Sequence, residues 1–190
     1  MMVVFVTNGK KFQQASILVE KLKETFPNIT SIKQNINNSH SNVIMGEQSV
    51  TLYGKDKIAD QLSDTTFKIS DQSFYQINSS QTEKLYQKAI EYAQLTGEET
   101  VLDTYCGIGT IGLYMAPVAK HVYGVEIVPS AIKDAQQNAT LNGFENTTFV
   151  CGKAEEVIIK WKQQGIKPDV VMEDPPRKGC DETFLQTLLK

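Results

Sequence analysis

The chain has 190 residues, of which 41% are hydrophobic and 22% charged, and its formal net charge is −3 at pH 7. This length suits one full domain and a smaller one, and the negative charge is not typical of a nucleic-acid-binding protein. The sequence has no apolar run as long as a membrane span, and its three cysteines form no CxxC pair. We therefore expect a cytoplasmic protein without a membrane partner, a disulfide framework or a metal centre.

The first part of the sequence predicts a small α+β domain. Its expected elements are a strand at 3–7, a helix at 12–26, and strands at 29–37, 49–53 and 66–69. Ile17, Leu18 and Leu22 give the helix one apolar face, and Pro27 follows its end. We place this domain at residues 1–72.

A polar and aromatic connector at 71–78 leads into a predicted helix. Ser80 and Glu83 have the spacing of a capping box, in which the serine oxygen accepts a free main-chain N–H and the glutamate reaches back. The side chains expected on the buried face of this helix are Leu85, Ala89, Tyr92 and Ala93.

After Gly97 strands and helices alternate, which predicts a doubly wound parallel sheet with right-handed crossovers. Four strands can be counted, and an apolar helical face begins at Phe184 shortly before the sequence stops at Lys190. We therefore place a Rossmann-like α/β domain at residues 73–190, and we expect it to be incomplete at its C-terminal end.

Three short segments follow strands of this second domain: Asp103-Thr-Tyr-Cys-Gly-Ile-Gly109, Gly124-Val-Glu126 and Asp174-Pro-Pro-Arg177. In an open parallel sheet, ligands bind in the crevice beyond the carboxyl ends of the strands. A glycine turn, an acid ending the second strand and an acid-Pro-Pro turn would face one crevice there. This combination indicates S-adenosylmethionine as the cofactor, and thus a methyltransferase. The 13 acidic against 9 basic residues at positions 97–190 suit a cationic sulfonium ligand.

A dinucleotide-binding fold is the alternative, because Gly107-Ile-Gly109-Thr-Ile-Gly112 matches G-x-G-x-x-G. Glu126 would hold ribose hydroxyls in either case. Two features favour the methyltransferase. Asp103 and three further residues stand before the first glycine and widen the loop for a methionine moiety, and Asp174-Pro-Pro176 has no role in nicotinamide binding.

Five segments carry a resemblance to a known family. They are Ser73-Phe-Tyr-Gln-Ile-Asn78, Asp103 to Leu113, Gly124-Val-Glu126, Gln137-Asn-Ala-Thr-Leu-Asn-Gly143 and Asp174-Pro-Pro-Arg-Lys-Gly179. In this order they resemble the RNA (uracil-5-)-methyltransferases, which modify uridines of 23S rRNA or tRNA. The match runs from about residue 73 to residue 190, and residues 1–72 would correspond to an RNA-contacting domain.

The resemblance implies a cofactor site and an RNA partner, with rRNA favoured over tRNA. Gln76 would contact S-adenosylmethionine from the connector, and Tyr105 would pack on it. Glu126 would bind its ribose, and Asp174 would lie near its amino end and the substrate. A core aromatic is the alternative for Tyr105, and an ordinary turn residue for Gln76.

The reaction that the resemblance implies is methylation of uridine C5 through a cysteine adduct at C6. That cysteine stands in a Ser-Cys-Asn-Pro-like turn, which this chain lacks, so we expect the nucleophile beyond Lys190 and an inactive fragment here. Cys106 and Cys151 are expected to be small buried residues. Cys180 has basic neighbours that would lower its pKa, but its turn follows the wrong strand for the nucleophile.

Two other functions stay open from the sequence. An amine-directed nucleic-acid methyltransferase would place an aromatic residue after the prolines, where this chain has Arg177. A non-catalytic RNA-binding module with a vestigial methyltransferase fold would keep the sheet without a working cofactor site.

Overall fold

The computed structural model describes residues 1–39, 43–175, 177, 179–180 and 182–188. The chain divides into two compact units: unit 1 comprises residues 1–59 and 68–72, and unit 2 comprises residues 60–67 and 73–190. Residues 60–67, which the sequence pattern assigns to the first domain, therefore lie in unit 2. Of the residues named from the sequence, Pro176, Lys178 and Lys190 lie outside the described residues.

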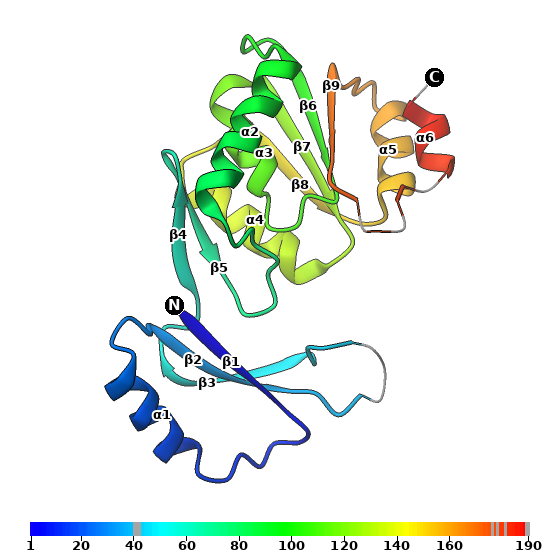
Figure 1. The fold of residues 1–190 in the computed structure, drawn as a ribbon. Helices are drawn as coiled ribbons and strands as arrows, with labels where there is room; N and C mark the ends of the chain where they lie inside the picture. Colours follow the sequence, from blue (N-terminus) through cyan, green and yellow to red (C-terminus); the bar gives the residue numbers. More distant parts are fainter. Residues whose placement is uncertain (40–42, 176, 178, 181, 189–190) are drawn as a thin grey trace. The chain divides into compact units, whose positions relative to one another are not determined.

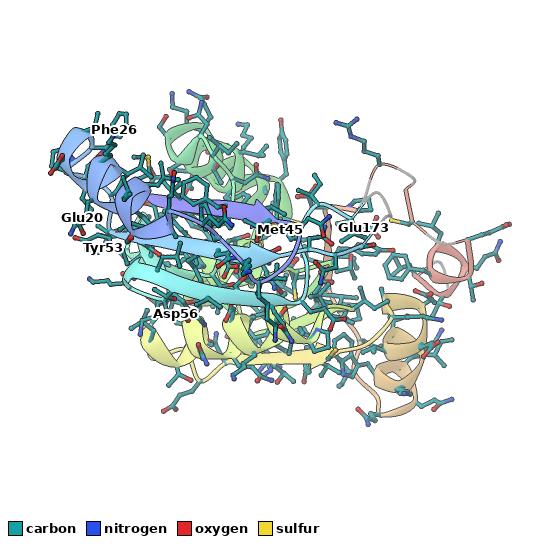
Figure 2. All side chains as sticks on the ribbon, turned by 90° about the horizontal axis from the view of Figure 1, so that it is seen from below. Glu20, Phe26, Met45, Tyr53, Asp56 and Glu173 are labelled. Carbon is teal, nitrogen blue, oxygen red and sulfur yellow. The ribbon has the colours of Figure 1, made fainter. Side chains whose placement is uncertain are left out.

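Unit 1 has the predicted α+β character. Its elements are β1 (Met2–Thr7), α1 (Ala15–Thr25), β2 (Ser31–Ile36) and β3 (Gln48–Gly54). The sheet has the order β1-β2-β3, with β1 parallel and β3 antiparallel to β2. Val19 of α1 is buried in a small apolar core with Ile29 and Ile32. Lys23 of α1 lies 4.7 Å from the ring centroid of Tyr53, a residue of β3 that Figure 2 labels.

The central strand of unit 1 buries polar side chains, which its sequence alone does not indicate. Lys33 is paired with Asp56 at 2.9 Å and with Asp71 at 2.7 Å, and Asp71 is as deeply buried as the lysine. The amide of Asn35 bonds both main-chain groups of Gly46, donating at 2.8 Å and accepting at 2.6 Å. Lys33 and Asn35 thus find partners that offset the cost of burying their polar groups, whereas the hydroxyl of Ser31 in the same strand is buried without a hydrogen-bond partner among the described residues.

Unit 2 is a doubly wound α/β domain, as predicted. Its parallel sheet consists of β6 (Thr100–Thr104), β7 (His121–Glu126), β8 (Thr147–Cys151) and β9 (Val170–Glu173), in the order β8-β7-β6-β9. The helices are α2 (Ser79–Ala93), α3 (Thr110–Met115), α4 (Pro129–Leu141), α5 (Ala154–Gln163) and α6 (Glu182–Leu188), and a 3-10 turn (Ala116–Val118) follows α3.

The two faces of this sheet carry separate apolar cores. Val101 of β6 packs with Met115 of α3, whereas its neighbour Leu102 packs with Trp161 of α5. Adjacent residues of a strand point to opposite faces, so helices must cover both sides of the sheet. Figure 1 shows α2, α3 and α4 on one face and α5 and α6 on the other.

The start of α2 differs from the prediction. Asn78 caps the helix, because its side-chain oxygen accepts the main-chain N–H of Gln81 at 3.2 Å. Ser80 lies inside the helix, so the predicted capping box at Ser80 and Glu83 is wrong. An asparagine is as good a cap as serine and stands two residues earlier.

The buried face of α2 is also shifted from the prediction. Leu85 and Tyr92 are 63% and 79% exposed, whereas Thr82 and Tyr86 are buried and Ala89 packs against the core. The ring of Tyr86 meets that of Tyr114 edge-on, with centroids 5.6 Å apart. The buried face of α2 therefore runs through Tyr86, which makes this aromatic contact, and not through Leu85 and Tyr92.

Within the described residues, none of the helices has the length and apolar character needed to cross a membrane. The same residues contain no cluster of three or more His, Cys, Asp or Glu side chains suited to a metal ion.

Candidate functional site

The carboxyl ends of β6, β7 and β9 border a cavity of about 820 Å³ in unit 2. Among the described residues, its lining comprises Tyr105, Val125, Glu126, Ile127, Gly152, Lys153, Ala154, Glu155, Asp174, Gly179, Cys180 and Glu182. Small-molecule sites in proteins have volumes of about 300–1,000 Å³. The cavity is therefore large enough for a nucleoside cofactor, and it stands where ligands bind in open parallel sheets.

Three of the four predicted cofactor residues meet at this cavity. Tyr105 comes from the loop after β6, Glu126 from the end of β7, and Asp174 from the turn after β9. Gln76 lies half-buried in the connector before α2 and is not part of the lining.

A second hollow, of about 280 Å³, lies elsewhere in unit 2, against α5 and α6. Its described lining is mostly apolar, with Tyr123, Trp161 and Val171 among its members, and it includes no carboxylate, thiol or imidazole. It offers neither the acids nor the strand ends that a cationic cofactor needs, so the larger cavity is the candidate site.

The loop between β6 and α3 shows how the glycines shape this cavity. Gly109 has φ of +80°, and a Cβ there would lie 3.0 Å from Cζ of Phe149. A Cβ on Gly107, where φ is +55°, would meet nothing within 4 Å. Gly109 thus allows the loop to pack on the domain, and Gly107 leaves open space. Tyr105, with φ of 59°, holds a left-handed conformation that is strained for a residue with a side chain.

Glu126 is held by main-chain donors on both sides. Its Oε2 accepts the N–H of Gly107 at 3.3 Å, and its Oε1 accepts the N–H of Val128 at 3.0 Å. A carboxylate has about four lone-pair sites, so two remain for other donors. An oriented carboxylate at the rim of a cavity can bind the two hydroxyls of a ribose.

Tyr105 belongs both to the cavity and to the core. Its ring packs edge-on against Phe184, with centroids 6.3 Å apart, and its side chain also lines the cavity. The core alternative and the predicted cofactor contact are therefore compatible.

Asp103 is a buried acid next to the site, and the sequence did not predict its burial or its protonation. Its side chain is 1% exposed, Oδ2 accepts the N–H of Gly112 at 2.8 Å, and Oδ1 has no hydrogen-bond partner. Burial raises the pKa of this carboxyl to about 7, and the charges of Asp174 and Glu126 act in the same direction. An acid at the end of a buried strand is the signal that could have identified it.

The cysteines differ from two expectations. Cys180 has a raised pKa, caused by burial and by the carboxylate of Glu173, whose Oε2 lies 3.5 Å from the sulfur. The expected lowering by basic neighbours is wrong because burial and the acid at the end of β9, labelled in Figure 2, both raise the pKa of this thiol. Cys151 is exposed rather than buried, and burial raises the pKa of Cys106 well above the ordinary value.

Comparison with known proteins supports the assignment of this domain. Residues 95–180 match the family model of a methyltransferase domain. The chain is 81% identical over 189 residues to a protein of Staphylococcus aureus strain COL, and 80% identical over 190 residues to one of Staphylococcus epidermidis, both named as uncharacterized RNA methyltransferases. All of the chain is matched, and it spans 42% of the length of either relative.

A solved structure has the same fold over nearly the whole chain. The crystal structure of Pyrococcus abyssi tRNA (uracil-54, C5)-methyltransferase in complex with S-adenosyl-L-homocysteine matches with a TM-score of 0.75 and 30% sequence identity. The match covers 98% of this chain and 43% of that one. The chain is therefore similar over its whole length to part of proteins named as RNA methyltransferases, and its unit 2 has the Rossmann-like fold of a methyltransferase domain.

Proposed function

We propose that the protein transfers a methyl group from S-adenosylmethionine to C5 of a uridine in RNA, and that unit 2 holds the cofactor. The observation that carries this proposal is the cavity at which Tyr105, Glu126 and Asp174 meet. The similarity to a tRNA (uracil-54, C5)-methyltransferase in complex with S-adenosyl-L-homocysteine supports both the cofactor and the uracil C5 chemistry.

The charges of the lining fit the cofactor. Glu126, Glu155, Asp174 and Glu182 face a single lysine, Lys153, among the described lining residues. Such a lining attracts a cation, and S-adenosylmethionine, when bound, supplies an electrophilic methyl group on a positively charged sulfur.

Each predicted residue then has a role in this proposal. Glu126 would accept the ribose hydroxyls, and Asp174 would attract the ammonium of the methionine part. Tyr105 would pack on the cofactor, and Gln76 would reach it from the connector. The first three belong to the cavity lining, and the role of Gln76 rests on the family resemblance.

Carbon 5 of uracil is a weak nucleophile, and the family resemblance supplies the way around this. A cysteine thiolate adds to C6, and the resulting enolate takes the methyl group at C5. A base then removes the C5 proton, and the thiolate leaves C6. Cys106 and Cys180 have raised pKa values, and Cys151 is not in the lining. We therefore infer that a part of the protein outside this chain contributes the nucleophile and the base.

The RNA itself is the least determined part of the proposal. The family resemblance covers enzymes for 23S rRNA and for tRNA, and the Pyrococcus abyssi relative is a tRNA enzyme by name. We propose 23S rRNA as the first substrate to test and tRNA as the second.

The decisive experiment uses the protein at the length of its Staphylococcus relatives. It is incubated with methyl-labelled S-adenosylmethionine and either 23S rRNA or tRNA, and the nucleosides are separated by mass spectrometry. We expect labelled 5-methyluridine. Label on an adenine or guanine nitrogen would instead favour the amine-directed enzyme.

The 190-residue chain provides the matched comparison. We expect it to bind the cofactor weakly and to transfer no methyl group. Stabilisation that grows with the concentration of S-adenosylhomocysteine supports a working cofactor site, because a ligand of the native state raises the melting temperature by mass action. If the protein at the length of its relatives methylates no RNA, and the 190-residue chain is not stabilised by the ligand, a vestigial RNA-binding module is favoured.

A further inference from the structure

Asp103 lies at the centre of a group of three acids. Its strand, β6, runs between β7 and β9, and Asp103 pairs in register with Gly124 on one side and Met172 on the other. Glu126 and Asp174 stand two positions further along those neighbours. The sheet thus brings one buried acid between two acids of the cavity lining.

The surroundings of Asp103 stabilise its charge poorly. The groups that face it are the N–H of Gly112 from α3, the hydroxyl of Tyr86 from α2, the thiol of Cys106 from the loop, and the carboxylates of Glu126 and Asp174. Only the Gly112 N–H donates to it, at Oδ2, and Oδ1 is buried without a partner. A buried carboxylate with an unpaired oxygen and two like charges nearby is costly in its ionised form.

A cation in the cavity would change this balance. Positive charge near the three acids favours the ionised form of each of them, and the effect is largest for the acid that is otherwise protonated. The raised pKa of Asp103, about 7, means that a large share of the molecules carry that proton at neutral pH. Glu126 accepts from two main-chain N–H groups, whereas Asp103 accepts from one and keeps an oxygen without a partner.

We propose that Asp103 couples cofactor binding to proton release: it carries a proton while no cation occupies the cavity, and gives it to solvent when S-adenosylmethionine enters. This inference rests on the proposed cofactor. Asp103 is a positioning residue here, because it acts through the N–H of Gly112 at the start of α3, next to the glycine loop. By linkage, cofactor affinity must then rise with pH up to neutrality and level off above it.

Titration calorimetry of the 190-residue chain tests this coupling. The binding enthalpy of S-adenosylmethionine is measured at pH 7 in phosphate and in Tris, which differ in ionisation enthalpy. We expect the difference to report release of roughly half a proton per cofactor, as linkage predicts for a group that titrates near the working pH. S-adenosylhomocysteine, which lacks the sulfonium charge, should release less.

Two variants assign the proton. Asp103→Asn keeps an oxygen for the Gly112 N–H and should bind S-adenosylmethionine with no proton release. Asp134→Asn is the matched control, because Asp134 is a buried aspartate of α4 outside the cavity lining, and it should release as much as the wild type. Equal release from Asp103→Asn and the wild type, or binding by the wild type without release, would overturn the coupling and leave the proposed function standing.

Carbon-13 NMR of the aspartate carboxyls in the wild type needs no variant. We expect the Asp103 signal to titrate near neutrality without ligand, and to titrate at a clearly lower pH with saturating S-adenosylmethionine. A titration in the ordinary carboxyl range without ligand contradicts the inference directly. A flat binding isotherm for S-adenosylmethionine with the chain and with the protein at the length of its relatives would instead overturn the cofactor role on which it rests.

Discussion

The main-chain N–H of Gly107 donates a hydrogen bond of 3.3 Å to Oε2 of Glu126. This contact joins the glycine loop after β6 to the acid at the end of β7, two parts of the cavity that are 19 residues apart in the chain. The other oxygen of the carboxylate accepts from Val128, so the side chain is oriented before any ligand arrives. Preorganisation of this kind lowers the entropic cost of binding.

Removal of the Glu126 carboxylate should therefore weaken cofactor binding strongly. Hydrogen bonds to charged groups contribute about 1.5–3 kcal/mol, so Glu126→Ala should raise the Kd for S-adenosylhomocysteine roughly 10- to 100-fold. Calorimetry on the purified variant checks this. Glu145→Ala, at an exposed acid outside the cavity lining, serves as the control and should bind like the wild type. Equal affinities for all three proteins would remove Glu126 from the site.

Gly109 and Gly165 form a matched pair for testing the packing of the loop. Both have φ of +80°, but a Cβ on Gly109 would lie 3.0 Å from Phe149, whereas one on Gly165 meets nothing within 4 Å. Alanine at either position bears the left-handed strain of about 1–2 kcal/mol. Gly109→Ala should lose a further 1–3 kcal/mol, roughly, to overpacking. Urea unfolding of the two variants measures the difference, and equal losses would contradict the close packing.

The side chain of Asn142, at the end of α4, binds Thr66 of the strand β5 (Thr65–Ile69), and both residues belong to unit 2. It bonds both main-chain groups of Thr66 at 2.8 Å, accepting from the N–H and donating to the carbonyl. Asn142→Ala should destabilise unit 2 by about 1–3 kcal/mol and speed hydrogen exchange at the Thr66 amide. Asn142→Asp keeps the acceptor and should protect that amide better than alanine does. The Val122 amide, inside the parallel sheet, is the internal reference.

Stability should depend on pH through Asp103. Its pKa is raised from 3.8 to about 7, so between these pH values the native state holds a proton that the unfolded state has lost. Raising the pH through this window therefore destabilises the native state, by on the order of 4 kcal/mol. Asp103→Asn has no carboxyl at this position, so this pH-dependent loss of stability should be absent from the variant. Urea unfolding of both proteins at pH 5 and pH 7.5 should show a larger loss in the wild type, and parallel losses would refute the raised pKa.

Cys180 should react slowly with alkylating agents. Thiolate is the reactive form, and burial together with Glu173 raises the pKa of the thiol. Glu173→Gln removes the nearby negative charge and should speed modification of Cys180 by iodoacetamide several-fold. Glu182→Gln changes an acid of the cavity lining that does not contribute to the raised pKa of Cys180, and it should leave the rate unchanged. Mass spectrometry of the labelled peptides gives both rates.

Local patterns sufficed for the elements and for part of the site. The alternation of strands and helices after Gly97 predicted the parallel sheet, since these elements have few ways to pack. The acids Glu126 and Asp174 were found because a parallel sheet collects its strand ends on one side. These inferences need only the order of residues along the chain.

Other features depend on contacts that no local pattern encodes. The buried face of α2 is set by Tyr86 meeting Tyr114, and the cap at Asn78 precedes the serine that the pattern favoured. In the polar strand β2, the buried Lys33 is paired with Asp71, 38 residues further on. Tyr114 and Asp71 act here from distant parts of the chain, whereas the cap at Asn78 is a local bond from the Gln81 N–H, in which asparagine takes the place of serine.

The sequence alone determined the class of fold, the ends of the strands and the identity of three acidic or aromatic side chains at one crevice. Only the tertiary structure decided the ionisation of Asp103 and Cys180. Electrostatic energy depends on burial and on distance to other charges, and both quantities exist only after distant segments have packed together.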